Sequence, residues 1–148
     1  MKELLKGNER IDDLEFKNLK IIKNKNNFCF GIDSVILSDF AKNIKKDSIV
    51  LDLGTGTGII GILLCGKTKL KNITGIEIQK EVAEMAKRTI ELNNLENKFK
   101  ILNEDIKELN KIFKKESIDA IVTNPPYKKK NTGIKNLNEI KLISKHEI

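Results

Sequence analysis

A glycine-rich turn between two apolar runs constrains the fold of this chain more than any other feature. Residues 49–54 read IVLDLG, a short run typical of a buried strand, and residues 59–66 read IIGILLCG, which predicts a helix. The turn between them carries Gly54, Gly56 and Gly58. Because glycine has no side chain, such a turn lets a ligand approach the backbone closely. The segment therefore predicts a strand, a turn and a helix in direct succession.

The rest of the chain repeats this alternation. Apolar runs at residues 72–78, 99–105 and 117–124 predict three further strands, and residues 80–94 predict a helix with an apolar stripe at every fourth position. Strands that alternate with helices form parallel sheets, because each crossover returns the chain to the same end of the sheet. We therefore expect an α/β fold with a doubly wound, mostly parallel sheet.

The residues ahead of the glycine turn predict a smaller N-terminal unit. Residues 18–23 and 28–30 flank KNKNN and read as a β-hairpin, and Asp33 can cap the helix that follows. We therefore divide the chain into residues 1–45, which hold the hairpin and helix, and residues 46–148, which hold the core. A length of 148 residues suits one structural domain for both.

The composition indicates a cytoplasmic protein and no membrane partner. No apolar run approaches the roughly 18 residues that a spanning helix needs, and MKELLKGNER lacks the apolar segment of a signal peptide. The two cysteines, Cys29 and Cys65, have neither metal nor redox spacing. We therefore expect buried thiols and no metal site.

Positive charge is concentrated toward the end of the sequence. The net charge is +7, and residues 106–148 hold ten basic and five acidic side chains. This excess surrounds the NPPY motif at residues 124–127 and favours attraction to a polyanion such as a nucleic acid. The alternative is a general abundance of lysine that serves no ligand.

Polar side chains stand at the carboxyl ends of all four predicted strands of the core. Asp52 lies within DLGTGTG, Glu77 and Asp105 end the second and third strands, and Asn124 begins NPPY. In doubly wound sheets, ligands bind beyond the carboxyl ends of the strands. Each residue also has a structural alternative, because acids cap helices and proline ends strands. Their coincidence at one edge favours a binding site.

The glycine turn supports two ligand classes. It matches the dinucleotide pattern GxGxxG at residues 56–61, and Glu77 lies 21 residues beyond Gly56, which fits a nicotinamide dehydrogenase. Against that rival, Asp52 would repel a pyrophosphate, and a second acid, Asp105, ends the third strand. A ligand with a cationic amino-acid portion and an adenosine suits these acids better. S-adenosylmethionine is such a ligand.

Four motifs occur together in this chain: VLDLGTGTG, an acid at the end of the second strand, an aspartate at the end of the third, and NPPY. This combination resembles the class I S-adenosylmethionine-dependent amino methyltransferases. FCFGIDSVILSDFA ahead of the turn and ISKHEI after NPPY are similar to segments of bacterial tRNA adenine N6-methyltransferases, which modify the adenine beside the anticodon of a valine tRNA. The resemblance implies a Rossmann-like fold, an S-adenosyl-L-methionine cofactor and a tRNA partner.

The resemblance also assigns cofactor contacts in the glycine turn and at the second strand. Gly54, Gly56 and Gly58 would let the backbone approach the methionine portion of the cofactor. Asp52 would position the ammonium group directly or through water, and Glu77 would accept hydrogen bonds from both ribose hydroxyls.

Further contacts follow from the third strand and the upstream motif. Asp105 would accept a hydrogen bond from the adenine amine of the cofactor. Phe30, Gly31 and Asp33 match the family's upstream motif and would close over the cofactor or the target, with a core role as an alternative for Phe30.

The NPPY motif would hold the group that receives the methyl. The side-chain oxygen of Asn124 and the carbonyl of Pro125 can accept hydrogen bonds from the two hydrogens of an exocyclic amine, which aims its lone pair at the methyl group. Pro126 would keep the loop rigid, and Tyr127 would stack on an extruded base. Asn124 would also border the cofactor. The leading function is adenine N6-methylation of tRNA.

Other functions stay open at this point. NPPY can hold any planar amino group, so a protein glutamine, a DNA adenine or an rRNA guanine are alternative substrates, and a non-catalytic cofactor-binding fragment is a third interpretation. The family's sheet has three more strands after NPPY, and the 21 residues after Tyr127 cannot supply them. We therefore expect a sheet that is incomplete at its C-terminal end, with Ile121 and Val122 exposed on an edge that promotes self-association.

Overall fold

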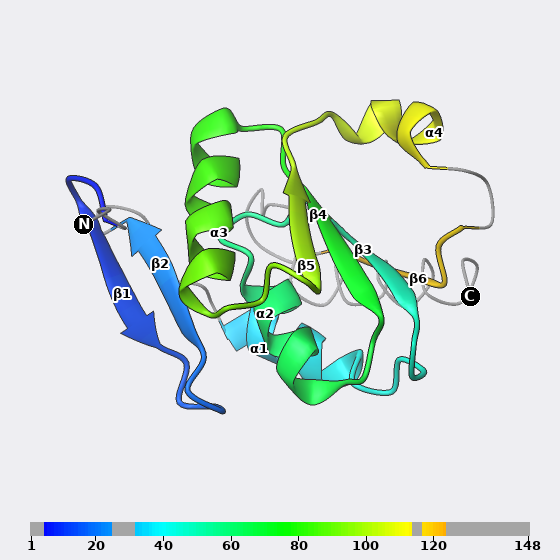
Figure 1. Cartoon of the computed structure of the whole chain (residues 1–148), viewed down its shortest axis with the longest axis horizontal. Coiled ribbons are helices and arrows are strands. Elements are labelled where there is room, and N and C mark those ends of the chain that lie inside the picture. Colours follow the sequence, from blue (N-terminus) through cyan, green and yellow to red (C-terminus); the bar gives the residue numbers. More distant parts are fainter. Residues whose placement is uncertain (1–4, 25–31, 114–116, 124–148) are drawn as a thin grey trace.

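A parallel four-stranded sheet forms the centre of the protein (Figure 1). The computed structural model describes residues 5–24, 32–113 and 117–123. Along the chain, the sheet and its helices are β3 (Ile49–Leu53), α2 (Ile59–Lys67), β4 (Asn72–Ile76), α3 (Lys80–Leu92), β5 (Phe99–Leu102) and β6 (Ala120–Thr123). The strand order is β5-β4-β3-β6, and every neighbouring pair is parallel. The expected α/β fold is confirmed.

The four strands end at a common level, next to the point where the winding of the sheet reverses. Leu53 on β3 is in register with Ile76 on β4 and with Thr123 on β6, and Ile76 is in register with Leu102 on β5. The chain moves outward from β3 through β4 to β5 and then returns to the other side of β3. Ligands of doubly wound sheets bind at this switch point, so the topology itself marks one edge as a candidate site.

Helix α2 lies at the centre of the apolar core. All its residues from Ile59 to Leu64 are buried, as expected for a helix that is apolar on every face. A Cβ atom at Gly61 would lie only 2.3 Å from the Phe99 ring on β5. Only glycine lets α2 and β5 approach this closely, so the last glycine of the GxGxxG match has a packing role that requires no ligand.

A β-hairpin precedes the sheet and lies on the far side of α3, which stands between the hairpin and β5 (Figure 1). Its strands are β1 (Glu9–Asp13) and β2 (Lys20–Asn24), and they pair antiparallel. The expected strand at 18–23 is confirmed, but the partner that the structure shows is β1, which precedes it. Residues 28–30, the partner predicted from the sequence, lie outside the described residues.

Side chains of helix α3 and of its C-cap residue, Asn93, hydrogen-bond to the backbone of β2. The Ile22 amide donates a hydrogen bond to the Thr89 hydroxyl at 3.1 Å. Asn93 makes a reciprocal pair with Lys20: its side-chain oxygen accepts from the Lys20 amide at 2.8 Å, and its side-chain amide donates to the Lys20 carbonyl at 2.7 Å. The helix thus satisfies backbone groups that a third strand would otherwise pair.

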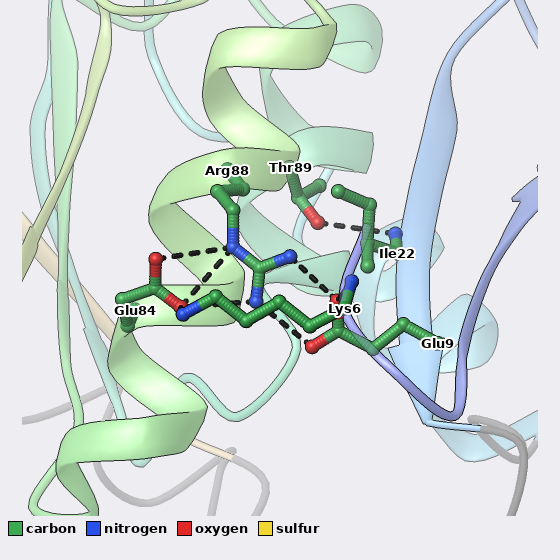
Figure 2. Close-up of polar contacts among 6 residues, drawn as sticks. All are labelled: Lys6, Glu9, Ile22, Glu84, Arg88 and Thr89. Atoms are coloured by element: carbon green, nitrogen blue, oxygen red, sulfur yellow. Dashed lines mark hydrogen bonds and ion pairs between the residues drawn. The ribbon is translucent and has the colours of Figure 1, made fainter. Parts of the chain in front are cut away.

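A buried ion cluster reinforces the same contact (Figure 2). Arg88 on α3 is 5% exposed and donates to both carboxylate oxygens of Glu9, at 2.5 and 2.8 Å. Its Nε lies 3.1 Å from each carboxylate oxygen of Glu84, one turn earlier on α3. These carboxylates hold the pKa of Arg88 above its ordinary value, chiefly through the hydrogen bonds to Glu9. Arg88 therefore stays charged and joins the hairpin to the helix.

The remaining helices precede the sheet or connect its last two strands in sequence. Helix α1 (Ile32–Phe40) packs against α2, and a short segment composed of η1 (Ile106–Glu108) and α4 (Leu109–Ile112) leads from β5 toward β6. In the part of the chain that the structure describes, no helix is long and apolar enough to cross a membrane.

Strand β6 borders the sheet within the described residues, where it pairs with β3 alone. The expected exposure of this strand is wrong for Val122, which is 2% exposed and belongs to the main core cluster. Ile121 is partly buried. Alternate residues of a strand face opposite sides of the sheet, so Val122 points into the core although the strand lies at the border. Self-association through this edge stays a prediction.

Candidate functional site

The glycine turn folds back onto the end of β4. Gly54, Gly56 and Gly58 have φ values of +68°, +57° and +86°, a left-handed conformation that side-chain-bearing residues rarely adopt. The amides of Gly54 and Thr55 both donate to the Ile76 carbonyl, at 2.9 and 3.0 Å. The turn predicted from the sequence is confirmed, and its shape requires glycine at these positions.

Asp52 lies beneath this turn and is completely buried. Its Oδ2 accepts a hydrogen bond from the Thr55 hydroxyl at 2.7 Å. Its Oδ1 is also buried, and no described residue donates a hydrogen bond to it. A buried carboxylate oxygen without a donor is costly, and a bound ligand, ion or water that donates to it would remove that cost.

Burial raises the pKa of Asp52 to about 7. Desolvation is the main cause, and the negative charge of Glu77 adds to it, whereas the hydrogen bond from Thr55 opposes the rise. The carboxyl group is therefore balanced between its neutral and charged forms near neutral pH. A cation placed near Oδ1 would favour the charged form.

Glu77 follows β4 and is 8% exposed. Its Oε1 accepts from the Gly56 amide at 2.9 Å, and its Oε2 accepts from the Gln79 amide at 3.1 Å. The carboxylate thus bridges the glycine turn and the start of α3. The structure brings Asp52, the glycine turn and Glu77 together, as the strand-end argument predicts.

Asp105 is placed differently from the sequence prediction. Strand β5 ends at Leu102, and Asp105 lies beyond it as the cap of η1, where its Oδ1 accepts from the Lys107 amide at 2.9 Å. The structural alternative of a helix cap is therefore observed. Asn103 lies between the end of β5 and Asp105 in the sequence. Its side-chain amide donates to the carbonyls of Glu77 and Ile78, at 2.8 and 3.0 Å, and so links the ends of β4 and β5.

The remaining predicted residues divide into two groups. Asp33 lies in the first turn of α1. Six predicted site residues lie outside the described residues: Phe30, Gly31, Asn124, Pro125, Pro126 and Tyr127. Thr123, which directly precedes NPPY, donates its hydroxyl to the Leu53 carbonyl at 3.1 Å. The chain therefore enters NPPY from a point beside the glycine turn.

Four residues at this edge are not among the site residues predicted from the sequence. Thr55 in the glycine turn lies against Gly75 on β4, since a Cβ atom at Gly75 would lie 2.7 Å from Thr55 Cβ, and no local sequence pattern indicates such a contact. Ile78 and Ile106 are 62% and 47% exposed, and each directly follows one of the acids, Glu77 or Asp105. An apolar residue directly after a strand-end acid is a signal that could have identified the last two.

Within residues 5–24, 32–113 and 117–123, no group of three or more histidine, cysteine or acidic side chains could hold a metal ion. Cys65 is a free thiol in the same part of the chain, and burial raises its pKa to about 11.

A family model described as the methyltransferase small domain matches residues 14–145. The chain belongs to this family. Among relatives of this methyltransferase small domain is a tRNA1(Val) (adenine(37)-N6)-methyltransferase from Histophilus somni, 31% identical over 119 residues, which are 78% of this chain and 48% of that protein. A release factor glutamine methyltransferase from Leptospira interrogans is 43% identical over 93 residues, 62% of this chain and 32% of that protein.

Solved structures show the same fold. A tRNA (uracil-54, C5)-methyltransferase from Pyrococcus abyssi, in complex with S-adenosyl-L-homocysteine, superposes with a TM-score of 0.58 at 21% identity, over 91% of this chain and 33% of that chain. The methyltransferase small domain described here spans about half the length of the tRNA methyltransferases that it matches.

Proposed function

We propose that this methyltransferase domain binds S-adenosyl-L-methionine at the carboxyl edge of the sheet. The observation that carries this proposal is the buried Asp52 carboxylate, whose Oδ1 accepts no hydrogen bond from the described residues. An ammonium group, held directly or through water, would satisfy that oxygen, and the methionine portion of the cofactor carries one. A pyrophosphate would instead add negative charge beside Asp52 and Glu77.

The glycine turn supports the same ligand. A Cβ atom at Gly54 or Gly56 would meet no atom within 4 Å, so open space adjoins the backbone where the methionine portion would lie. Gly58 differs, because a Cβ there would contact Ala86 and Phe99 at 3.6 Å. We assign Gly54 and Gly56 to the ligand and Gly58 to both the turn and the packing beneath it.

The nucleoside would lie over the ends of β4 and β5. Glu77 would accept hydrogen bonds from the ribose hydroxyls, which would compete with its present donors, Gly56 and Gln79. Asp105 would accept from the adenine amine. Ile78 and Ile106, which directly follow these two acids and are strongly exposed, offer apolar surface to a planar base.

The transfer step itself would use the NPPY motif. When bound, the cofactor supplies a methyl group on a positively charged sulfur, which is an electrophile. Asn124 and Pro125 would accept hydrogen bonds from the amine that attacks it, Pro126 would keep the loop rigid, and Tyr127 would stack on the target base. Phe30, Gly31 and Asp33 would close over the site.

We propose the N6 position of an adenine in tRNA as the acceptor. Support comes from the matching relatives, several of which are named tRNA1(Val) (adenine(37)-N6)-methyltransferases. We place such an enzyme in the cytoplasm with its tRNA substrate. Incubation of the protein with methyl-labelled cofactor and unmodified total tRNA should label the tRNA, and nuclease digestion should release N6-methyladenosine.

A second candidate is methylation of a glutamine side chain in a release factor. It is favoured by the higher identity, 43%, to the glutamine methyltransferase over 93 residues. The same labelled cofactor, offered with purified release factors and with DNA, separates the candidates. Label in the protein fraction alone would replace the tRNA proposal with this one, and label in DNA alone would reject both.

A further inference from the structure

The contact between Thr55 and Asp52 involves a residue that is neither one of the glycines nor one of the acids of the proposed site. Thr55 is 6% exposed, and its hydroxyl donates to Asp52 Oδ2 at 2.7 Å. One of the two carboxylate oxygens of Asp52 therefore already accepts a hydrogen bond from the protein. The other, Oδ1, has no donor among the described residues.

The neighbouring strand fixes the position of Thr55. Gly75 on β4 is in register with Asp52 on β3. A Cβ atom at Gly75 would lie 2.7 Å from both Cβ and Oγ1 of Thr55. Because Gly75 lacks that atom, the threonine side chain fits against β4 with its hydroxyl directed at Asp52. Gly75, Thr55 and Asp52 thus form a contiguous series across the two strands.

We propose that Thr55 is a positioning residue for the ammonium group of the cofactor: its hydroxyl donates to Oδ2 of Asp52 and leaves Oδ1 as the oxygen that receives the cation. This inference rests on the proposed cofactor. It adds a residue to the site and couples binding to a proton.

The surroundings of Asp52 support this coupling. Its register partners are Gly75 on β4 and Val122 on β6, neither of which carries charge. The nearby acidic side chain of Glu77 acts on Asp52 through its charge and disfavours the charged form of Asp52. With burial, these surroundings bring the pKa of Asp52 to about 7 in the protein without cofactor. A bound cation favours the charged form of Asp52 and lowers its pKa, so the carboxyl group loses its proton.

The first experiment follows the protein without cofactor. Selective ¹³C labelling of aspartate lets NMR record the titration of Asp52, which Asp52→Asn identifies by loss of the signal. We expect a midpoint near 7 in the wild type. Thr55→Val keeps the shape but removes the hydroxyl that favours the charged form, so the midpoint should rise by about one unit. Thr55→Ser, which keeps the hydroxyl, should restore the wild-type midpoint.

Two further variants separate position from fold stability. Gly75→Ala should displace Thr55 and raise the midpoint in the same direction as Thr55→Val. Thr57→Val removes a hydroxyl from the same turn without touching the contact with Asp52, and it should leave the midpoint unchanged. An equal midpoint in the wild type and Thr55→Val, with both proteins folded by circular dichroism, would overturn the proposed role of Thr55.

The second experiment measures S-adenosyl-L-homocysteine binding by calorimetry between pH 5.5 and 8.5, in buffers of different ionisation enthalpy. Below the midpoint, binding to the wild type should release about one proton, and affinity should rise with pH until Asp52 is ionised. In Thr55→Val this rise should move to higher pH, and in Asp52→Asn the proton release should disappear. A loss of affinity in Thr55→Val that is equal at every pH would contradict the inference.

The two experiments also distinguish this inference from the proposed function. If the wild type binds neither S-adenosyl-L-methionine nor S-adenosyl-L-homocysteine, the proposed cofactor is wrong, whatever the NMR titration shows. If it binds them with the same affinity across the pH range and releases no proton, the cofactor stands and the role of Thr55 and Asp52 in positioning its ammonium group is wrong.

Discussion

Arg88 and Glu9 are 79 residues apart in the sequence, yet two nitrogens of the guanidinium contact both oxygens of the carboxylate (Figure 2). Both side chains are largely buried, at 7% and 11% exposure. Removing one partner of a buried ion pair leaves the other charge unpaired, which costs far more than the loss of a surface pair. The hairpin and α3 should therefore depend on this contact.

Arg88→Met should lower the free energy of unfolding by about 3–5 kcal/mol, because Glu9 stays buried without its cation. Urea denaturation followed by circular dichroism measures this change. Arg10→Met is the matched control, since Arg10 is 50% exposed and pairs with Asp12 at the surface. The control should cost less than about 1 kcal/mol. Equal losses in both variants would mean that the buried cluster contributes nothing specific.

The same cluster predicts a loss of stability in acid. The hydrogen bonds from Arg88 hold the pKa values of Glu9 and Glu84 below their ordinary value of 4.5. Depressed carboxyl pKa values stabilise the folded state above the ordinary value, and this contribution disappears as the pH falls through the depressed values. Thermal unfolding between pH 6 and pH 3 should therefore show a smaller decline in Arg88→Met than in the wild type.

The raised pKa of Asp52 predicts the opposite dependence of stability on pH. Its pKa is raised from 3.8 to about 7, so its contribution to stability is fully present below pH 3.8 and is lost as the pH rises through about 7. A shift of this size corresponds to about 4 kcal/mol. Between pH 5 and pH 8, the melting temperature of Asp52→Asn should rise relative to that of the wild type without cofactor. A constant difference would show that folded Asp52 is already ionised at pH 5, which contradicts the raised pKa.

Gly61→Ala should destabilise the core, because the new Cβ atom would lie 2.3 Å from the Phe99 ring. Overpacking of this kind costs about 1–3 kcal/mol or more. Thermal denaturation of Gly61→Ala, Phe99→Leu and the double variant tests the contact. The smaller leucine should make the alanine less harmful, so the double variant should be more stable than the sum of the single effects predicts. Additive losses in the double variant would show that Gly61→Ala does not act through contact with Phe99.

Glu77→Ala should weaken S-adenosyl-L-homocysteine binding by removing two charge-assisted hydrogen bonds to the ribose, each worth about 1.5–3 kcal/mol before solvent compensates. Calorimetry with S-adenosyl-L-homocysteine and, separately, with NADH measures the effect. Glu81→Ala is a matched control, because Glu81 is an exposed acid in the first turn of α3. Tight NADH binding without S-adenosyl-L-homocysteine binding would support the dehydrogenase instead.

Asn124→Ala should lower kcat for methyl transfer by more than tenfold and leave the affinity for the cofactor nearly unchanged, because Asn124 is proposed to act on the incoming amine. Asp52→Ala should show the reverse pattern, with its main effect on cofactor affinity. Steady-state kinetics on tRNA, combined with calorimetry, separates these effects. If both variants lost only cofactor binding, NPPY would be a structural loop.

The predictable part of the fold is the part with strong local patterns. Residues 49–54 and 72–78 are apolar runs bounded by turn residues, and the structure places strands there. Strand β1 was missed because its sequence, ERIDD, has one apolar residue, Ile11, and follows no strand pattern. Its stability comes from pairing with β2 and from the ion pair between Glu9 and Arg88, which are contacts over long sequence distances.

The site shows the same division. Gly54 and Glu77 were predicted from their positions after strands, and the topology of the sheet brings them together. The contact of Thr55 with Gly75 could not be predicted, because it depends on the register of β3 with β4. Asp105 was predicted at the end of a strand, but the segment DIK satisfies its own backbone through the Asp105 cap, and the strand ends earlier.

The hydrogen bonds that Ile22 and Lys20 donate to Thr89 and Asn93 can form only after the ribosome has synthesised α3 and its C-cap. Their partners, Thr89 and Asn93, are 67 and 73 residues further along the chain. A two-stranded hairpin is marginally stable alone in water. At about 5–20 residues per second, the ribosome therefore exposes the hairpin segment for about 3–15 seconds before α3 exists to hold it. During that interval the open edge of β2 is available to a chaperone or to another nascent chain, and it closes only when α3 has formed.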